Sequence, residues 1–255
     1  MNNVSIEPQV QPLKNPGLDS LRSANSALPD LSGAPDLVDQ VYNALVKAIS
    51  SGLLAPSFRC TQEQLAAQFG ISRQPVLQAL RLLKRDGLVQ DAPGRGLQIV
   101  PLQAEVIAWV YQLRSALDAL AAELASLQSA SIDPKLIEAG RYATAERDLP
   151  GLIEADMAFH QAIYKASGNP MIVSSAKMHW CHIQRAMGEV LRGESIRRSV
   201  WDEHEAIAEA VSSGDAIRAR RLASSHGHEA SAFMISQLLK MEHTNETEPG
   251  AVSAI

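Results

Sequence analysis

The chain has few of the residues that build disulfide-stapled or membrane-spanning proteins. It contains two cysteines, Cys60 and Cys181, which are far apart in 255 residues and form no CxxC pair. A disulfide framework is therefore not expected, and a reducing compartment is favoured. No apolar run approaches the roughly 20 residues that cross a bilayer, and the N-terminus lacks the basic-then-apolar pattern of a secretory signal. We expect a cytoplasmic protein without a membrane partner.

Aromatic residues are also scarce, at 4%, although hydrophobic residues make up 46% of the chain. This balance is typical of helical proteins rich in alanine and leucine. The net charge of −5 at pH 7 argues against a basic surface over the whole chain. Residues 36–101 differ, because seven Lys and Arg stand against five Asp and Glu there, a local net charge of +2. The asymmetry fits one DNA-binding module joined to a part that does not bind DNA.

Composition and periodicity divide the chain into four stretches. Residues 1–35 are rich in Pro, Ser, Asn and Gly without a sustained period, which predicts a mobile tail. Residues 36–101 predict helices and a β-hairpin, residues 102–241 predict roughly six amphipathic helices, and residues 242–255 predict a second tail. The expected fold class is mainly α, with an N-terminal winged helix-turn-helix that carries a small β-hairpin wing. An antiparallel all-α bundle is expected to follow it.

The winged helix-turn-helix prediction comes from residues 61–96, TQEQLAAQFGISRQPVLQALRLLKRDGLVQDAPGRG. Thr61 and Gln64 have the spacing of a capping box at the start of a first helix, which Gly70 ends. Ser72 is placed to cap a second helix with a buried apolar stripe. Two short strands around the Pro-Gly-Arg-Gly turn complete the hairpin. This order of elements places the second helix in the DNA major groove and the wing beside it.

Polar side chains on the exposed arc of the second helix, and at the wing tip, are suited to contact DNA. Arg pairs bidentately with guanine, and Gln reads adenine or binds phosphate. A basic residue at the wing tip reaches phosphates or the minor groove. The residues to which we assign DNA contacts are Arg73, Gln74, Gln78, Arg81 and Arg95.

The segment GISRQPVLQALRLLKRDGLV with its GRG wing resembles the N-terminal domain of GntR-type transcriptional regulators over residues 37–100. The resemblance implies a homodimer that reads a palindromic operator in double-stranded DNA, more often as a repressor released by ligand than as an activator. One departure is Leu77, where the family usually has Arg. One expected DNA contact is therefore absent, and a contact with a thymine methyl group is an alternative.

Four polar residues of the C-terminal half fall on the apolar faces of their helices. Asp156 and His160 share one face, and His204 and His226 each align with an apolar stripe, whereas His228 lies on the opposite face and is expected in solvent. An unpaired buried carboxylate is strongly disfavoured. The periodicity leaves two resolutions open, which are a buried hydrogen-bonded network and a shared divalent metal.

The segments DMAFHQAIYKASGNP, WDEHEAIAEAVSSGD and SSHGHEA resemble the ligand-binding domain of the FadR branch of the GntR regulators, over about residues 105–238. The resemblance implies a metal held by an Asp-x3-His pair and two further His. Zn²⁺ is the expected ion, with Ni²⁺ or Mn²⁺ as alternatives. The implied ligands are Asp156, His160, His204 and His226.

Arg114 stands in VYQLRSALDALAA, which resembles the opening helix of the same family domain. The resemblance implies that Arg114 faces the cavity and binds an acidic effector, whereas the residues alone equally allow an ordinary surface ion pair with Asp118. A small carboxylate, an organic acid, would suit both Arg114 and a metal. Two other functions stay open, namely a regulator whose signal is the metal itself and a metal-dependent hydrolase. The hydrolase is disfavoured because no HExxH motif or general base is evident, so we do not expect an enzyme.

Overall fold

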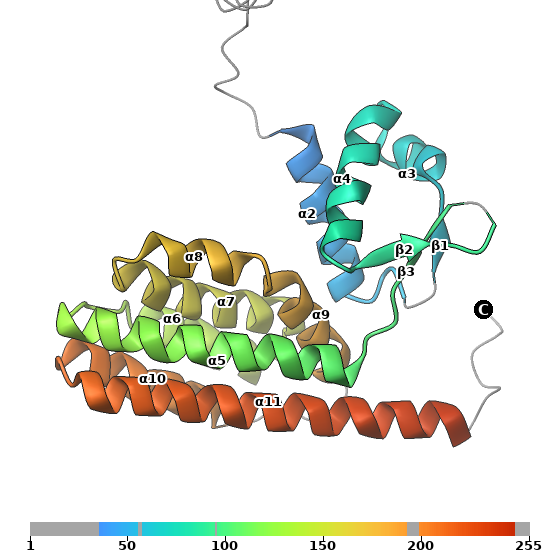
Figure 1. Ribbon diagram of the computed structural model, residues 1–255. Helices are drawn as coiled ribbons and strands as arrows, with labels where there is room; N and C mark the ends of the chain where they lie inside the picture. The colour runs from blue at the N-terminus through green and yellow to red at the C-terminus, as the bar shows by residue number, and fades with distance from the viewer. Residues whose placement is uncertain (1–35, 56–57, 95, 193–198, 248–255) are drawn as a thin grey trace, which may run out of the picture. The chain divides into compact units, whose positions relative to one another are not determined.

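The computed structural model describes residues 36–55, 58–94, 96–192 and 199–247 (Figure 1). The N-terminal tail expected over residues 1–35 and the wing-tip Arg95 lie outside these ranges. The described chain is mainly helical, with one small sheet, as the fold class predicted. Among the described residues, none of the helices has the combination of length and hydropathy that a bilayer crossing requires.

The N-terminal part is the expected winged helix-turn-helix, with one additional strand. Its elements in chain order are α2 (Leu37–Ser50), β1 (Arg59–Cys60), α3 (Gln62–Phe69), α4 (Arg73–Arg85), β2 (Val89–Asp91) and β3 (Leu97–Ile99). The strands form an antiparallel sheet in the order β1-β3-β2, so β1 extends the wing hairpin by a third strand. The sequence predicted only the two strands of the hairpin, because a strand of two residues is too short to show the alternation that marks one.

Local sequence signals account for the helix-turn-helix. Thr61 Oγ1 accepts from the Gln64 backbone N–H at 3.2 Å and Gln64 Oε1 accepts from the Thr61 N–H at 2.8 Å, which confirms the capping box. Gly70 ends α3 with a φ of +65°, a left-handed conformation that glycine adopts without steric cost. Ser72 is the N-cap residue of α4, as predicted, but among the described residues its side chain makes no cap hydrogen bond. Pro75, the third residue of α4, has no backbone N–H, so it cannot donate one of the hydrogen bonds that an N-cap side chain accepts.

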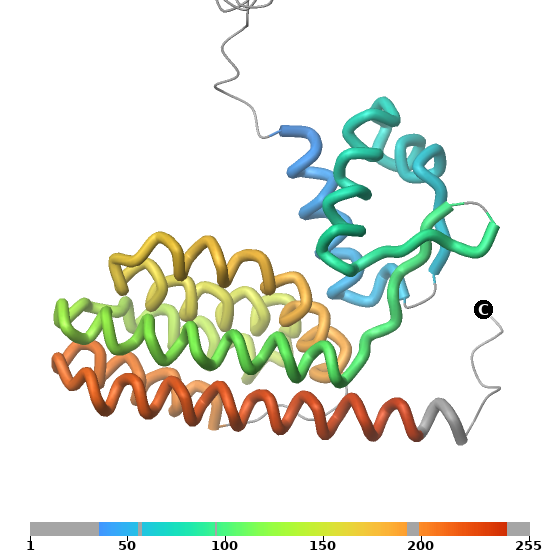
Figure 2. Tube along the Cα trace, viewed as in Figure 1, coloured from blue at the N-terminus to red at the C-terminus, as the bar shows by residue number. Residues whose placement is uncertain are grey.

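The C-terminal part is an all-helical bundle, drawn from green to red in Figure 2. Its helices are α5 (Ala104–Leu127), α6 (Lys135–Ala145), α7 (Leu149–Ala166), α8 (Pro170–Lys177), α9 (Trp180–Val190), α10 (Val200–Ser212) and α11 (Ala216–Thr247). The described residues thus form seven helices rather than the roughly six expected. The long helices α5 and α11 lie side by side (Figure 1). Helix α11 also runs past residue 242, where we expected a tail to begin.

Candidate metal centre

Three helices of the bundle bring the four predicted metal ligands together. Helix α7 carries Asp156 and His160 one turn apart, α10 carries His204, and α11 carries His226. All four side chains are buried, as their apolar helical phase predicted. His228, on the opposite face of α11, is exposed, which confirms its expected position in solvent.

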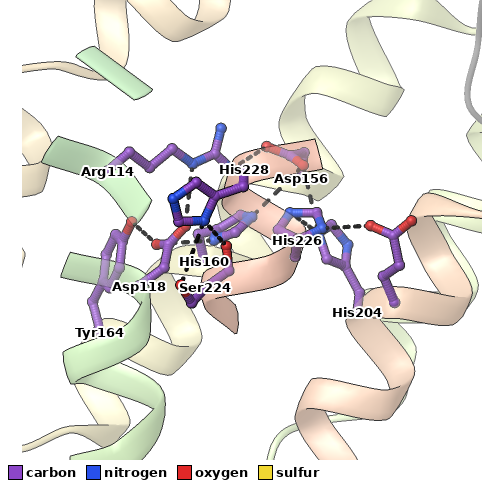
Figure 3. A network of polar contacts seen from close by, with 10 residues as sticks. Arg114, Asp118, Asp156, His160, Tyr164, His204, Ser224, His226 and His228 are labelled. Atoms are coloured by element: carbon purple, nitrogen blue, oxygen red, sulfur yellow. Dashed lines mark hydrogen bonds and ion pairs between the residues drawn. The ribbon is translucent and has the colours of Figure 1, made fainter. Parts of the chain in front are cut away.

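The ring nitrogens that face one another or Asp156 Oδ1 are Nε2 atoms, and Figure 3 shows the residues that carry them. His204 Nε2 lies 3.2 Å from His226 Nε2. Asp156 Oδ1 lies 3.7 Å from His204 Nε2 and 3.8 Å from His160 Nε2. One ring nitrogen from each of the three histidines lies within 4.8 Å of the others. Side chains separated by up to 70 residues therefore converge on one buried point, which helical phase alone could not establish.

The donor atoms at this point fit a divalent cation. His160 Nε2 is buried and makes no hydrogen bond within the described residues, so its lone pair or proton is unmatched. Burial, together with the Arg114 cation, lowers the pKa of His160, which keeps the ring neutral at pH 7. Neutral imidazoles and a carboxylate are the ligand set that zinc and related transition metals accept. The arrangement therefore has the chemistry of a metal site.

Arg114 is buried beside this point rather than exposed on the surface. Its Nη2 lies 3.1 Å from Asp156 Oδ2, and its Nε lies 3.5 Å from Asp118 Oδ2. The pair with Asp118 exists, but both side chains are only 4% exposed, so an ordinary surface pair is the wrong interpretation. Burial opposes the charge of Arg114, yet the two carboxylates raise its pKa above the usual value. The guanidinium therefore remains charged inside the bundle.

Three further residues belong to the network and were not predicted. Asp118 Oδ1 accepts a short hydrogen bond from the Tyr164 hydroxyl and lies 3.3 Å from His160 Nδ1. Glu203 Oε2 lies 2.9 Å from His226 Nδ1. Burial raises the pKa of Asp118, but His160 and Arg114 outweigh it and hold the pKa below its usual range. The i, i+4 spacing of Tyr164 from His160 was an available signal, whereas nothing in the pattern marked Glu203.

A small cavity of about 50 Å³ adjoins the centre. Arg114, Asp156 and His226 supply its polar lining. The rest of its wall is apolar or aromatic and consists of Tyr111, Leu152, Met187, Leu191, Val200, Trp201, Ala230, Phe233 and Met234. Trp201 is buried in the bundle and also faces this cavity.

The predicted DNA-contacting residues lie on helix α4, where Arg73, Gln74, Gln78 and Arg81 are all exposed. Arg73 Nη1 lies 3.5 Å from Glu63 Oε1, but its side chain remains 70% exposed. The buried stripe of α4 packs into the core of the winged helix. The polar arc is therefore presented to solvent by a helix fixed from its other side.

Comparison with known proteins identifies both parts of the chain. Residues 37–99 match the family of bacterial regulatory proteins named gntR, and residues 109–229 match the FCD domain. An uncharacterised helix-turn-helix-type transcriptional regulator of Bacillus subtilis, YdhC, is 31% identical over 182 residues, which are 68% of this chain and 79% of that protein. The chain belongs to the GntR family. This GntR protein is a transcriptional regulator with an FCD effector-binding domain, not an enzyme.

A further relative and a solved structure support the family and the fold of this GntR regulator. An uncharacterised regulator from an unstable DNA locus of Streptomyces ambofaciens is 31% identical over 192 residues, 73% of this chain and 80% of that protein. The solved structure of Escherichia coli McbR/YncC superposes with a TM-score of 0.68 at 22% identity, covering 80% of this chain and 100% of that chain. At this identity the likeness speaks for the fold alone, and it confirms the mainly helical architecture.

Proposed function

We propose that this GntR regulator is a repressor. A small carboxylate, bound beside a divalent metal in the bundle, lowers its affinity for the operator. The observation that carries the proposal is the convergence of three histidine Nε2 atoms and Asp156 next to a cavity lined by Arg114. Buried perturbed groups around a concave, mostly apolar space are typical of ligand sites. Repression relieved by ligand is the mode that the resemblance favours.

Asp156, His160, His204 and His226 would hold the metal, and Zn²⁺ suits three imidazoles and a carboxylate best, with Ni²⁺ and Mn²⁺ as alternatives. When bound, the cation supplies a Lewis acid that accepts an anionic oxygen. The residues of the chain do the rest of the recognition. Arg114 offers a charged guanidinium to the carboxylate of the effector, which requires it to exchange its partner Asp156. The apolar cavity wall favours an acid with a small, non-polar body.

The proposal includes a homodimer that reads a palindromic operator through two copies of α4. Helix α5 carries an exposed apolar stripe in which Trp109, Leu113, Leu120 and Leu127 recur at helical spacing on one face. Trp109 is 57% exposed and Leu127 is 68% exposed, which is unusual for large apolar side chains. A second copy of the chain would cover this stripe. The Leu120→Glu variant should then sediment as a monomer in analytical ultracentrifugation.

The test begins with operator DNA selected from genomic fragments by the purified, untagged protein. Its affinity is then measured for zinc-loaded and chelator-treated protein, with and without a panel of small carboxylic acids. The neutral amides of the same acids serve as controls. We expect an acid, but not its amide, to weaken operator binding by the zinc-loaded protein and to leave the chelated protein unaffected. Operator affinity that ignores every acid would overturn the effector assignment.

A second candidate is that the metal itself is the signal. It is favoured by the double role of Asp156, which contacts Arg114 through Oδ2 and faces the histidines through Oδ1. Metal binding would compete for this carboxylate and so change the pairing of Arg114 without any organic acid. In that case operator affinity should change on chelation alone, and the same four measurements distinguish the two candidates.

A further inference from the structure

We propose that Asp118 and Glu203 are positioning residues that decide which nitrogen of His160 and His226 faces the metal centre. The inference rests on the proposed metal site and concerns two carboxylates outside the four ligands. A metal-binding histidine needs one nitrogen with a free lone pair, and the hydrogen bond of its other nitrogen decides which one that is.

Glu203 performs this role for His226. Its Oε2 lies 2.9 Å from His226 Nδ1, within hydrogen-bonding distance. An ionised carboxylate can only accept, so the proton must lie on Nδ1, and Nε2 keeps its lone pair. That Nε2 is the atom that meets His204 Nε2 at 3.2 Å. Glu203 therefore directs the ligating nitrogen of α11 inward from the neighbouring helix α10.

Asp118 performs the same role for His160 from helix α5. Its Oδ1 lies 3.3 Å from His160 Nδ1, and it is itself held by the Tyr164 hydroxyl and by Arg114. With the proton on Nδ1, the lone pair of His160 Nε2 points toward Asp156 Oδ1 at 3.8 Å. Two lone pairs that face each other in a buried site repel unless a cation lies between them. The outer carboxylate thus favours the tautomer that only a metal satisfies.

Of the two carboxylates, Asp118 ties in a helix that carries none of the four ligands, and Glu203 adds a second contact between two helices that do. Asp118 links α5 to α7, and Glu203 links α10 to α11. Outer carboxylates of this kind typically change metal affinity by about 10- to 100-fold when removed. A purely structural ion pair would change stability but would leave the tautomer of the histidine unaltered.

The test compares Glu203→Gln and Asp118→Asn with Glu205→Gln in untagged, full-length protein. Glu205 lies on the same helix as Glu203 but is exposed and pairs with Arg141 at 2.8 Å, which makes it a matched control. An amide accepts more weakly and can donate to Nδ1 instead, which moves the proton to Nε2 and makes ligation through that atom less favourable. We expect zinc affinity, measured by chelator competition, to fall about 10- to 100-fold in the first two variants and to stay unchanged in the control.

Nitrogen-15 NMR of the metal-free proteins reads the tautomers directly. We expect Nδ1–H rings for His160 and His226 in the wild type and a shift toward Nε2–H in the matching variant. Glu203 is half-buried, so its variant remains informative if Asp118→Asn fails to fold. Wild-type affinity and unchanged tautomers in Glu203→Gln would overturn the inference while leaving the metal site intact. Failure of the wild type to bind zinc, nickel or manganese would overturn both.

Discussion

The winged helix and the bundle use charged residues in opposite ways. In the winged helix, the residues suited to contact DNA lie on the exposed face of α4, and the core beneath them is apolar. In the bundle, the charged and titratable residues suited to hold a ligand are buried, among them Arg114, Asp118 and His160. A function carried on the surface can change without disturbing the fold. A function carried in the interior is part of what holds the fold together.

The energetic scales of the two regions differ accordingly. An exposed pair such as Arg73 with Glu63 contributes about 0–1 kcal/mol, because water screens both charges. Removing one partner of a buried pair costs about 3–5 kcal/mol, because it leaves an uncompensated charge without solvent. Mutations of the functional residues in the bundle should therefore lower the free energy of unfolding. Mutations of the exposed residues of α4 should leave it nearly unchanged.

The largest expected effect is that of Arg114→Ala. It leaves Asp118 and Asp156 buried without their shared cation, so the free energy of unfolding should fall by about 3–5 kcal/mol. Denaturant unfolding of the metal-free protein measures this change. A loss below about 1 kcal/mol, the range of exposed pairs, would erase the proposed contrast between the two regions.

His160→Ala tests the contribution of the metal to the bundle. Saturating zinc, at 100 times its dissociation constant, should stabilise the wild type by about 2.7 kcal/mol and raise its melting temperature. The variant lacks one of the four proposed ligands and should show no such increment. His228→Ala, an exposed histidine of the same bundle, is the control and should respond to zinc like the wild type. Equal stabilisation by zinc in all three proteins would show that His160 is not a metal ligand.

Arg73→Ala probes the surface side of the comparison. From its place at the start of α4, we expect specific operator binding to weaken by about 1–3 kcal/mol. Its unfolding free energy should stay within about 0.5 kcal/mol of wild type, since the side chain is largely exposed. Fluorescence anisotropy with operator and with scrambled DNA separates specific from general binding. Unchanged operator affinity would show that Arg73 makes no specific contact with the operator.

Thr61→Ala gives the smallest expected effect. The substitution removes the side-chain half of the capping box at α3, which should cost about 1 kcal/mol of stability. Zinc binding by the bundle should be unaffected, and isothermal titration of the variant checks this. A change in zinc affinity would mean that the capping box of α3 is energetically coupled to the metal centre.

The features that could be predicted from the sequence are those written into short segments. The capping box at Thr61, the glycine stop at Gly70 and the inward phase of His204 each depend on neighbours within a few residues or on helical spacing. Strand β1 could not be predicted, because its pairing partner β3 lies nearly 40 residues away. The separation of α8 from α9 could not be predicted either, because no proline or glycine marks the break at Met178 and His179.

The carboxylates around the four proposed ligands, Asp118 and Glu203, could not be predicted from the sequence as part of the candidate site. Periodicity shows which way a residue faces, but not which residue of another helix it meets. Asp118 therefore looked like one half of a surface pair, whereas packing of α5 against α7 brings it to His160. The four inward-facing residues were predicted to act together because the resemblance implied that they share a metal. Neither the periodicity nor the resemblance marked Glu203.

Metal stoichiometry tests the central claim most directly. Untagged protein, dialysed free of metal and titrated with zinc, should bind one ion per chain, as measured by elemental analysis after removal of excess. The same titration of His204→Ala, which removes a fully buried proposed ligand from α10, should leave no tightly bound ion. A wild-type protein that retains no stoichiometric zinc, nickel or manganese would contradict the account, as would a His204→Ala variant that retains as much as the wild type.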